Sequence, residues 1–161
     1  MPTIGRNEIV TISHPLRKDN LGGIKPPWEV SKQSGFNMLS AKIDTGALSN
    51  SIRAEEIKYM DGNEVKYIAY RLGGVWSPWI EINQECKTVK SSCGCNDERP
   101  VVWCQLSMGI GENKLTENYV EFTITQNSGM TSAILIGRKT IKRFKALVDC
   151  RAKYMLGRPG D

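Results

Sequence analysis

The alternation of apolar and polar residues predicts a chain built mainly of short strands. Glu8–Ile12 and Met38–Ile43 alternate with a period of two, as expected of strands that bury one face. Asp61-Gly62 is a hairpin turn signal. It follows a short extended segment over residues 54–60. Further strands are predicted at Glu64–Leu72, Trp79–Val89, Pro100–Met108, Asn118–Thr125, Ala133–Ile136, Ala146–Val148 and Lys153–Leu156.

One helix is predicted, over Arg138–Phe144, because Ile141 and Phe144 fall on the same helical face. The stretch Ser13–Asn37 contains three prolines and three glycines, which predicts a long loop inserted in a single domain 1–161. His14 lies in this loop and is predicted to be solvated. Many short strands with one late helix favour a small β-barrel or sandwich.

Composition narrows the classes of protein that fit. The 161 residues are 40% hydrophobic and 24% charged, which is typical of a globular chain with a real core. No apolar run approaches the roughly 18–20 residues of a membrane span, and no secretory signal is visible. The cysteines are odd in number, which argues against a closed disulfide framework and for a reducing, cytoplasmic setting. They are Cys86, Cys93, Cys95, Cys104 and Cys150.

Positive charge gathers at the carboxyl end. Residues 138–161 hold eight Lys/Arg and two Asp, or +6, against +5 for the whole chain. Such a segment could attract nucleic acid or an acidic partner. No aromatic residues are interleaved for base stacking, so we expect a solvated surface and no nucleic-acid partner.

Several catalytic classes lack their residues. With one histidine, a two-histidine metalloprotease helix is impossible, and no Gly-x-Ser-x-Gly elbow or phosphate-binding loop occurs. The cysteine spacing does not form regular zinc knuckles. A hairpin centred near Cys95 would pair Cys86 with Cys104, too far from the tip for all to share one ion. We therefore expect no cofactor. Cys93 and Cys95 are read as thiols open to oxidation, with metal binding as the weaker alternative.

Asp44-Thr45-Gly46 carries the main chemical signal, because an acid on a Thr-Gly turn closes a predicted strand. Aspartic proteases activate water between two aspartates that share a proton. This chain has one such tripeptide, so catalysis predicts a symmetric homodimer. Thr45 would lock the two turns together, and Gly46 would allow close backbone approach. An ordinary strand-ending turn is the alternative.

The flanks of this turn resemble a known family. Ala41–Ala54 is similar to the Asp-Thr-Gly-Ala segment of retropepsin-like aspartic proteases that are often described as ATP-dependent zinc proteases and are associated with ATP-grasp peptide ligases. The resemblance covers nearly the whole chain apart from residues 13–37, and implies a retropepsin-like closed β-barrel with one short C-terminal helix. Its other motifs are Ile4–Glu8, Val89–Gly94, Glu98–Val102, Leu135–Arg138 and Leu147–Asp149.

The resemblance also implies roles and shows departures. Gly137 and Arg138 would brace the active-site and dimer region. Leu48 and Arg53 stand where the family has a basic residue and a histidine, and retroviral proteases have an acid near the Leu48 position to pair with the arginine. Arg138 therefore needs another partner here, and Asp149 is one candidate.

Three functional hypotheses follow. The first is a homodimeric aspartic endopeptidase that hydrolyses peptide or protein substrates through Asp44 of each subunit. Within Gly73–Arg99, a flap would use Gly73, Gly74 and Trp76. The second is a catalytically silent retropepsin-fold subunit of a larger assembly, for example a virus particle. The third is a redox or metal-responsive module that uses Cys93 and Cys95.

Overall fold

The computed structural model describes residues 1–14, 35–62, 66–82, 86–90, 96–126 and 132–160. These ranges are mainly β, with a single short α-helix among them, α1 (Arg138–Arg143). No helix in the described part of the chain has the length and apolar character needed to cross a membrane. The strands are β1 (Thr3–Ile4), β2 (Asn7–Ser13), β3 (Gly35–Ile43), β4 (Asn50–Arg53), β5 (Glu56–Asp61), β6 (Lys66–Leu72), β7 (Val75–Trp76), β8 (Ile80–Ile82), β9 (Cys86–Lys90), β10 (Asn96–Met108), β11 (Leu115–Thr125), β12 (Ile134–Ile136) and β13 (Leu147–Val148).

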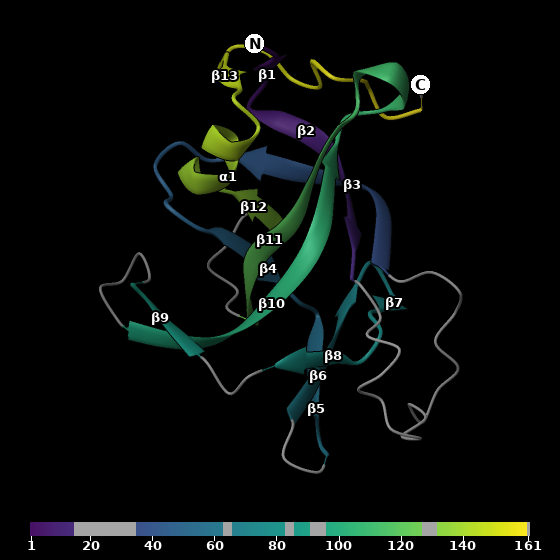
Figure 1. Cartoon of the computed structure of the whole chain (residues 1–161), viewed down its shortest axis with the longest axis vertical. Coiled ribbons are helices and arrows are strands. Elements are labelled where there is room, and N and C mark those ends of the chain that lie inside the picture. The colour runs from purple at the N-terminus through teal and green to yellow at the C-terminus, as the bar shows by residue number, and fades with distance from the viewer. Residues whose placement is uncertain (15–34, 63–65, 83–85, 91–95, 127–131, 161) are drawn as a thin grey trace.

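Six strands close into a barrel. Their order is β11-β4-β12-β3-β2-β10, and β10 pairs again with β11 to complete the ring. The long strands β10 and β11 cross the front of the molecule, with α1 beside them (Figure 1). Closure removes the free edges that an open sheet of this size would expose. The mainly β, closed-barrel prediction with one short helix is therefore confirmed.

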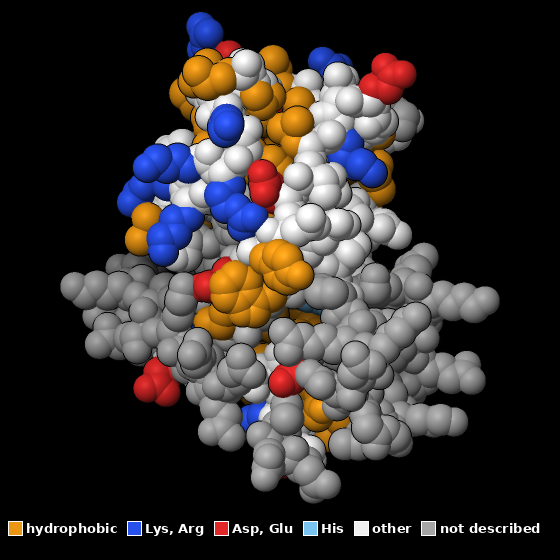
Figure 2. Space-filling view, viewed as in Figure 1, with side chains coloured by type: hydrophobic (Ala, Val, Ile, Leu, Met, Phe, Trp, Pro, Cys, Tyr) orange, Lys and Arg blue, Asp and Glu red, His pale blue; other side chains and the backbone are white. Residues whose placement is uncertain are grey.

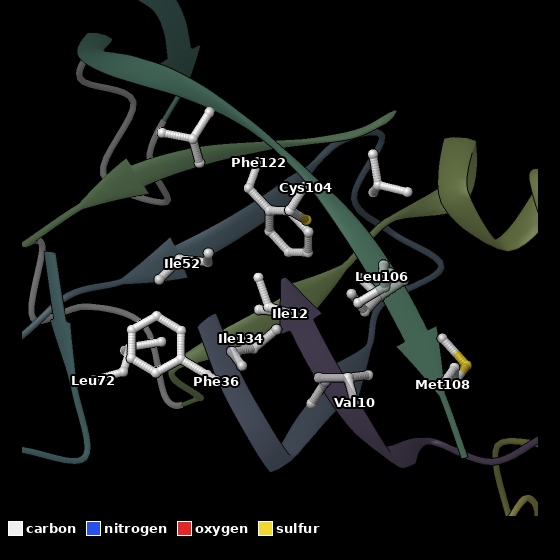
Figure 3. Packing of buried hydrophobic residues seen from close by; sticks show 14 of the residues in the cluster. Val10, Ile12, Phe36, Ile52, Leu72, Cys104, Leu106, Met108, Phe122 and Ile134 are labelled. Carbon is white, nitrogen blue, oxygen red and sulfur yellow. The ribbon is translucent and has the colours of Figure 1, made fainter. Parts of the chain in front are cut away.

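The barrel interior is filled by the inward-facing residues of each strand. Val10, Ile12, Ile52, Leu106 and Phe122 are all fully buried, and their side chains converge from four strands (Figure 3). Each such side chain contributes roughly 1.5–3 kcal/mol through removal of its apolar surface from water. The period-two alternation is thus explained by one core that all six strands share.

A second sheet, formed by β5 to β8, packs one of its faces on this core. Ile68, Tyr70 and Leu72 of β6 join the main core, whereas Tyr67 and Ala69 face the other way. Those two residues form a smaller cluster with Trp79, which is buried.

Three local predictions were wrong in extent or type. Ser13 belongs to β2 and residues 35–37 belong to β3, so the predicted loop 13–37 is shorter at both ends; residues 15–34 lie outside the described residues. The predicted strand Trp79–Val89 is two strands, β8 and β9, with different partners. Cys86 is opposite Pro100 and not Cys104, which pairs with Val120.

The predicted final strand Lys153–Leu156 is a series of turns. Tyr154 and Gly157 have positive φ, at 53° and 133°, which breaks an extended path. The completely buried Glu8 holds this segment against the start of the chain. Its carboxylate accepts hydrogen bonds from the N–H groups of Gly5 (2.7 Å), Met155 (2.9 Å) and Leu156 (3.0 Å). A carboxylate far away in the sequence therefore determines the conformation of the carboxyl end.

Candidate active site

The Asp44 turn emerges where β12 separates the two strands that the turn connects. β12 lies between β3, to which it is parallel, and β4, to which it is antiparallel. The Asp44 N–H donates to the Ile136 carbonyl at 2.9 Å, which is the last contact before the chain leaves β3. The turn is therefore fixed by strand pairing that spans about ninety residues of sequence.

Local chemistry then shapes the turn. The Gly46 N–H donates to Asp44 Oδ1 at 2.9 Å, and the Ala47 N–H donates to the Asp44 carbonyl at 3.2 Å. This is the local side-chain bonding for which aspartate is favoured in turns. Asp44 is half-buried, while Thr45 and Gly46 are exposed. The carboxyl group is thus oriented by the turn and close to the surface, where a second group can reach it.

The first residue of α1 donates hydrogen bonds to main-chain carbonyls of the Asp44 loop. Arg138 Nη1 donates to the Thr45 carbonyl at 3.0 Å, and the Arg138 N–H donates to the Ala47 carbonyl at 2.8 Å. A Cβ on Gly137 would lie 2.6 Å from the Ser49 carbonyl oxygen, so only glycine fits there without a shift. The predicted brace residues, Gly137 and Arg138, are therefore brought against the predicted catalytic turn.

Asp149 is not the partner of Arg138. Its carboxylate accepts from Arg151 Nε at 3.1 Å, and these hydrogen bonds lower the pKa of Asp149. Arg138 instead holds a main-chain carbonyl. The candidate Arg138–Asp149 pair is wrong, because Arg151, two residues along the chain, binds the Asp149 carboxylate.

Asn50 is a site residue that the sequence reading missed. It is buried, and its Nδ2 donates to Thr140 Oγ1 (2.6 Å) and to the Glu121 carbonyl (3.0 Å). Its Oδ1 accepts the Gly137 N–H at 2.8 Å. One side chain therefore ties β4, β11 and α1 together behind the Asp44 loop. The sequence feature that could have identified Asn50 is its place on the buried face of β4, where it alternates with half-buried positions and shares that face with Ile52.

The departures from the resembled family lie on either side of Asn50. Leu48 is 51% exposed, in the loop that Arg138 and Lys139 hold by their backbone contacts. Arg53 ends β4, and its N–H donates to the Ala133 carbonyl at 2.8 Å. Neither substitution disturbs the strand pairing around the turn.

The predicted flap residues lie in the second sheet. Gly73 and Gly74, with φ of 56° and 76°, form the turn between β6 and β7. Trp76 is half-buried, with the Lys58 ammonium 4.7 Å from its ring centroid. The flap role of these residues stays a prediction. Cys93 and Cys95 lie outside the described residues.

His14 is buried, contrary to the predicted solvated position. Its Nδ1 is 3.1 Å from the Trp103 carbonyl, which can only accept, so Nδ1 carries the proton. Its Nε2 then accepts from the Tyr70 hydroxyl at 2.6 Å. Burial lowers the pKa of His14 to about 4 and raises that of Tyr70 well above its usual range. The imidazole is consequently neutral at pH 7.

The described residues do not form the zinc site that the name of the resembled family implies. Within the described ranges no three His, Cys, Asp or Glu side chains group as metal ligands. Both His14 ring nitrogens are engaged by Trp103 and Tyr70, and Cys104 is a buried free thiol. No metal-dependent step is derived for this site.

Sequence comparison finds a matching family and a relative. Residues 30–159 match the family described as RimB-like, retropepsin-like aspartic endopeptidase RimB. A Shewanella pealeana protein named "Probable alpha-L-glutamate ligase" is 28% identical over 140 residues, which are 83% of this chain. The chain spans 29% of the length of that relative.

A solved structure shares the fold. It is a crystal structure of a Legionella pneumophila protein of unknown function, with a TM-score of 0.55 and 23% identity. The similarity covers 95% of this chain and 96% of the other.

Proposed function

Because the chain belongs to the RimB-like family of retropepsin-like aspartic endopeptidases, we propose that it hydrolyses peptide bonds as a homodimer. The observation that carries this proposal is the Asp44 turn, held by β12 and by the Arg138–Thr45 contact at 3.0 Å. The sequence supplies one Asp-Thr-Gly, and aspartic chemistry needs two carboxylates. The site is therefore complete only with a second copy.

The proposed reaction places one Asp44 from each subunit on either side of a water molecule. One carboxylate takes a proton from the water, whose oxygen attacks the peptide carbonyl carbon. The other carboxyl group gives its proton to the carbonyl oxygen, which forms a neutral tetrahedral intermediate. The protonated aspartate then gives its proton to the amine nitrogen as the C–N bond breaks, and one hydroxyl of the intermediate gives its proton to the other aspartate while the new carboxyl group forms. The two aspartates again share one proton. No covalent enzyme intermediate forms.

We further propose that the substrate is a peptide that contains glutamate. The support is the name of the relative, a glutamate ligase, together with the basic helix next to the turn. Four of the six residues of α1 are Arg or Lys, and α1 starts against the Asp44 loop. Carboxylate side chains are attracted to such a surface.

The substitution Asp44→Asn tests the proposed mechanism. It replaces the carboxyl group by an amide of nearly the same size, so the variant should fold but cannot transfer a proton at this position. Cleavage of glutamate-rich peptides should fall by at least about a thousandfold, as expected when a catalytic unit is broken. Adding excess Asp44→Asn protein to the wild type should also inhibit, because mixed dimers carry one working carboxylate. Undiminished cleavage by the variant would refute the mechanism.

A matched pair of peptides tests the substrate. A glutamate-containing peptide and its glutamine counterpart have equal length, and only the first carries charge. We expect the acidic peptide to be cleaved with the higher kcat/KM, and equal rates would reject the glutamate preference while leaving aspartic chemistry in place.

The second candidate is a catalytically silent subunit of a larger assembly. Leu48 supports it, because this residue is 51% exposed at a position near which retroviral proteases have an acid. It predicts an assembled protein that cleaves neither peptide. Restoring an acid by Leu48→Asp should then leave cleavage absent. We also propose that the protein works in the cytoplasm, or in a particle assembled there.

A further inference from the structure

Two exposed aromatic residues mark a surface that the proposed cleavage chemistry does not use. Trp103 of β10 is 49% exposed and Tyr119 of β11 is 75% exposed. Both residues line each of two hollows, with volumes of about 390 and 120 Å³. Figure 2 shows hydrophobic side chains gathered at the middle of this face, over the region that β10 and β11 cross. Large aromatic side chains beside hollows are a common feature of protein-binding surfaces.

Tyr119 is held in this position by an irregularity of the sheet. Cys104 is opposite Val120 and Leu106 is opposite Glu117. Two residues of β11, Asn118 and Tyr119, therefore oppose the single residue Gln105 in a β-bulge. Bulges re-aim side chains, and this one directs a large aromatic residue to solvent.

The bulge is strained and is clamped by α1. Tyr119 has φ of 57°, a left-handed conformation that is costly for a residue with a bulky side chain. Arg143 donates to the carbonyls of Tyr119 (3.0 Å) and Asn118 (2.5 Å), and to Glu117 Oε2 (3.0 Å). Strain of this kind persists only where surrounding contacts impose it. Three hydrogen bonds from the single side chain of Arg143 thus hold the exposed Tyr119 in place.

Positive charge borders the aromatic pair. Lys139 and Arg143 of α1 line the smaller hollow together with Ser49 and Thr140, and Lys142 is exposed on the same helix. Figure 2 shows the Lys and Arg side chains in the α1 region next to the hydrophobic patch. Glu117 pairs with Arg143, while the lysines remain on the exposed side of the helix. An apolar centre with a basic rim is complementary to an apolar side chain flanked by carboxylates.

We propose that Trp103, Tyr119 and the α1 lysines form a docking surface for a partner-protein segment with an apolar side chain next to acidic residues. The apolar side chain packs between the two aromatic rings and the hollows, and the carboxylates face Lys139 and Lys142. Glu117 and Glu121 lie beside the aromatic pair, so the acidic residues of the bound segment face the lysine side of the patch and its apolar side chain faces the aromatic side. This docking shares the α1 lysines with the surface proposed above to attract glutamate side chains, but it adds the aromatic pair and does not require Asp44.

The test uses the full chain with Asp44→Asn, so that the probe cannot be cut. The probe is a fluorescein-labelled peptide of sequence Glu-Asp-Phe-Leu-Asp-Glu, and its binding is followed by fluorescence anisotropy. Trp103→Ser combined with Tyr119→Ser should weaken binding at least about 30-fold, the loss typical of central interface aromatics. Lys139→Gln combined with Lys142→Gln should weaken it about fivefold and reduce its salt dependence.

Matched controls separate this surface from general effects. Leu147→Ser removes another exposed apolar side chain, and Lys114→Gln with Lys153→Gln removes the same charge elsewhere. Both should bind the probe as the parent does. A probe with serine in place of Phe-Leu, and one with lysine in place of the acids, should both bind at least about tenfold more weakly.

Three results would overturn the proposal. One is no saturable binding of the acidic probe up to millimolar concentration. Another is equal affinity for the parent and the aromatic double variant, with circular dichroism confirming that both are folded. The third is sedimentation showing that the aromatic variant converts a dimer to a monomer, which would make this surface the contact between two copies. A protein that binds the probe through this surface but cleaves nothing would support docking and reject only the protease proposal.

Discussion

The side-chain oxygen of Asn50 accepts the backbone N–H of Gly137 at 2.8 Å, and so joins the strand after the Asp44 turn to the residue that starts α1. The same carboxamide donates to Thr140 and to the Glu121 carbonyl. Three segments that are distant in sequence therefore meet on one buried amide. The position of the Asp44 loop depends on that meeting, because Gly137 and Arg138 are the residues that contact the loop.

Asn50→Ala should destabilise the fold. The substitution leaves a buried N–H, a hydroxyl and a carbonyl without their partner, and each such loss costs about 1–3 kcal/mol. We expect the free energy of unfolding in urea to fall by about 2–4 kcal/mol. Gln105→Ala, which removes an exposed amide bonded to Asn118, is the control and should change it by less than about 0.5 kcal/mol. Equal effects of the two substitutions would show that the Asn50 network is not structural.

Arg138→Ala should separate activity from stability. The guanidinium contacts the Thr45 carbonyl at an exposed site, so its loss should change the unfolding free energy by less than about 1 kcal/mol. The catalytic turn would lose one of its anchors, and we expect kcat/KM for peptide cleavage to fall at least about tenfold. Lys114→Ala is the control, because it removes an exposed positive charge that lies outside α1 and outside the Asp44 loop. Full activity of the Arg138→Ala variant would show that the Arg138 contact does not position the Asp44 turn.

Glu8→Ala should loosen the carboxyl end. The variant leaves three buried or partly buried N–H groups without an acceptor, those of Gly5, Met155 and Leu156. We expect a loss of about 3 kcal/mol or more in unfolding free energy. Hydrogen exchange of the Met155 and Leu156 amides should accelerate before the barrel strands open.

Glu112→Ala is the matched control for Glu8, because Glu112 is exposed in the 3-10 helix Gly111–Asn113. It should leave both the unfolding free energy and the exchange of these amides unchanged. Slow exchange at Met155 and Leu156 in Glu8→Ala would mean that other contacts hold the carboxyl end.

His14 should make stability depend on pH. Its pKa is about 4 in the folded protein because of burial, against an ordinary value of 6.5. Between these values the unfolded chain binds more protons, so the free energy of unfolding rises with pH from about 4 to 6.5 and is level above. The full difference is about 3 kcal/mol on the linkage relation.

The measurement for His14 is urea unfolding of the wild type and of His14→Gln from pH 4 to 8. Glutamine does not titrate, so the difference between the two free energies should grow toward neutral pH. Profiles that stay parallel throughout would show that the imidazole does not titrate differently in the two states. The groups facing it are Tyr70 and the Trp103 carbonyl, and neither ionises in this range.

Much of the fold was readable along the chain. Period-two alternation located β2 and β3, and the end of β12 before the basic helix was visible at Gly137-Arg138. The Asp61-Gly62 pair predicted the hairpin that joins β5 and β6, because its backbone preferences are local. The Asp-Thr-Gly tripeptide indicated the candidate chemistry, on which the proposed homodimer rests. These features are properties of neighbouring residues, so sequence alone determines them.

The tertiary structure decided what depends on distant partners. His14 was expected in solvent, yet Tyr70 and Trp103 enclose it, and Asp149 was assigned to Arg138 although Arg151 occupies it. Asn50 carried no motif at all. Burial and hydrogen-bond partners are set by barrel closure, which brings β4, β11 and α1 together across ninety residues of chain. Residue type records what a side chain can bond to, and only the closed barrel determines which partner it meets.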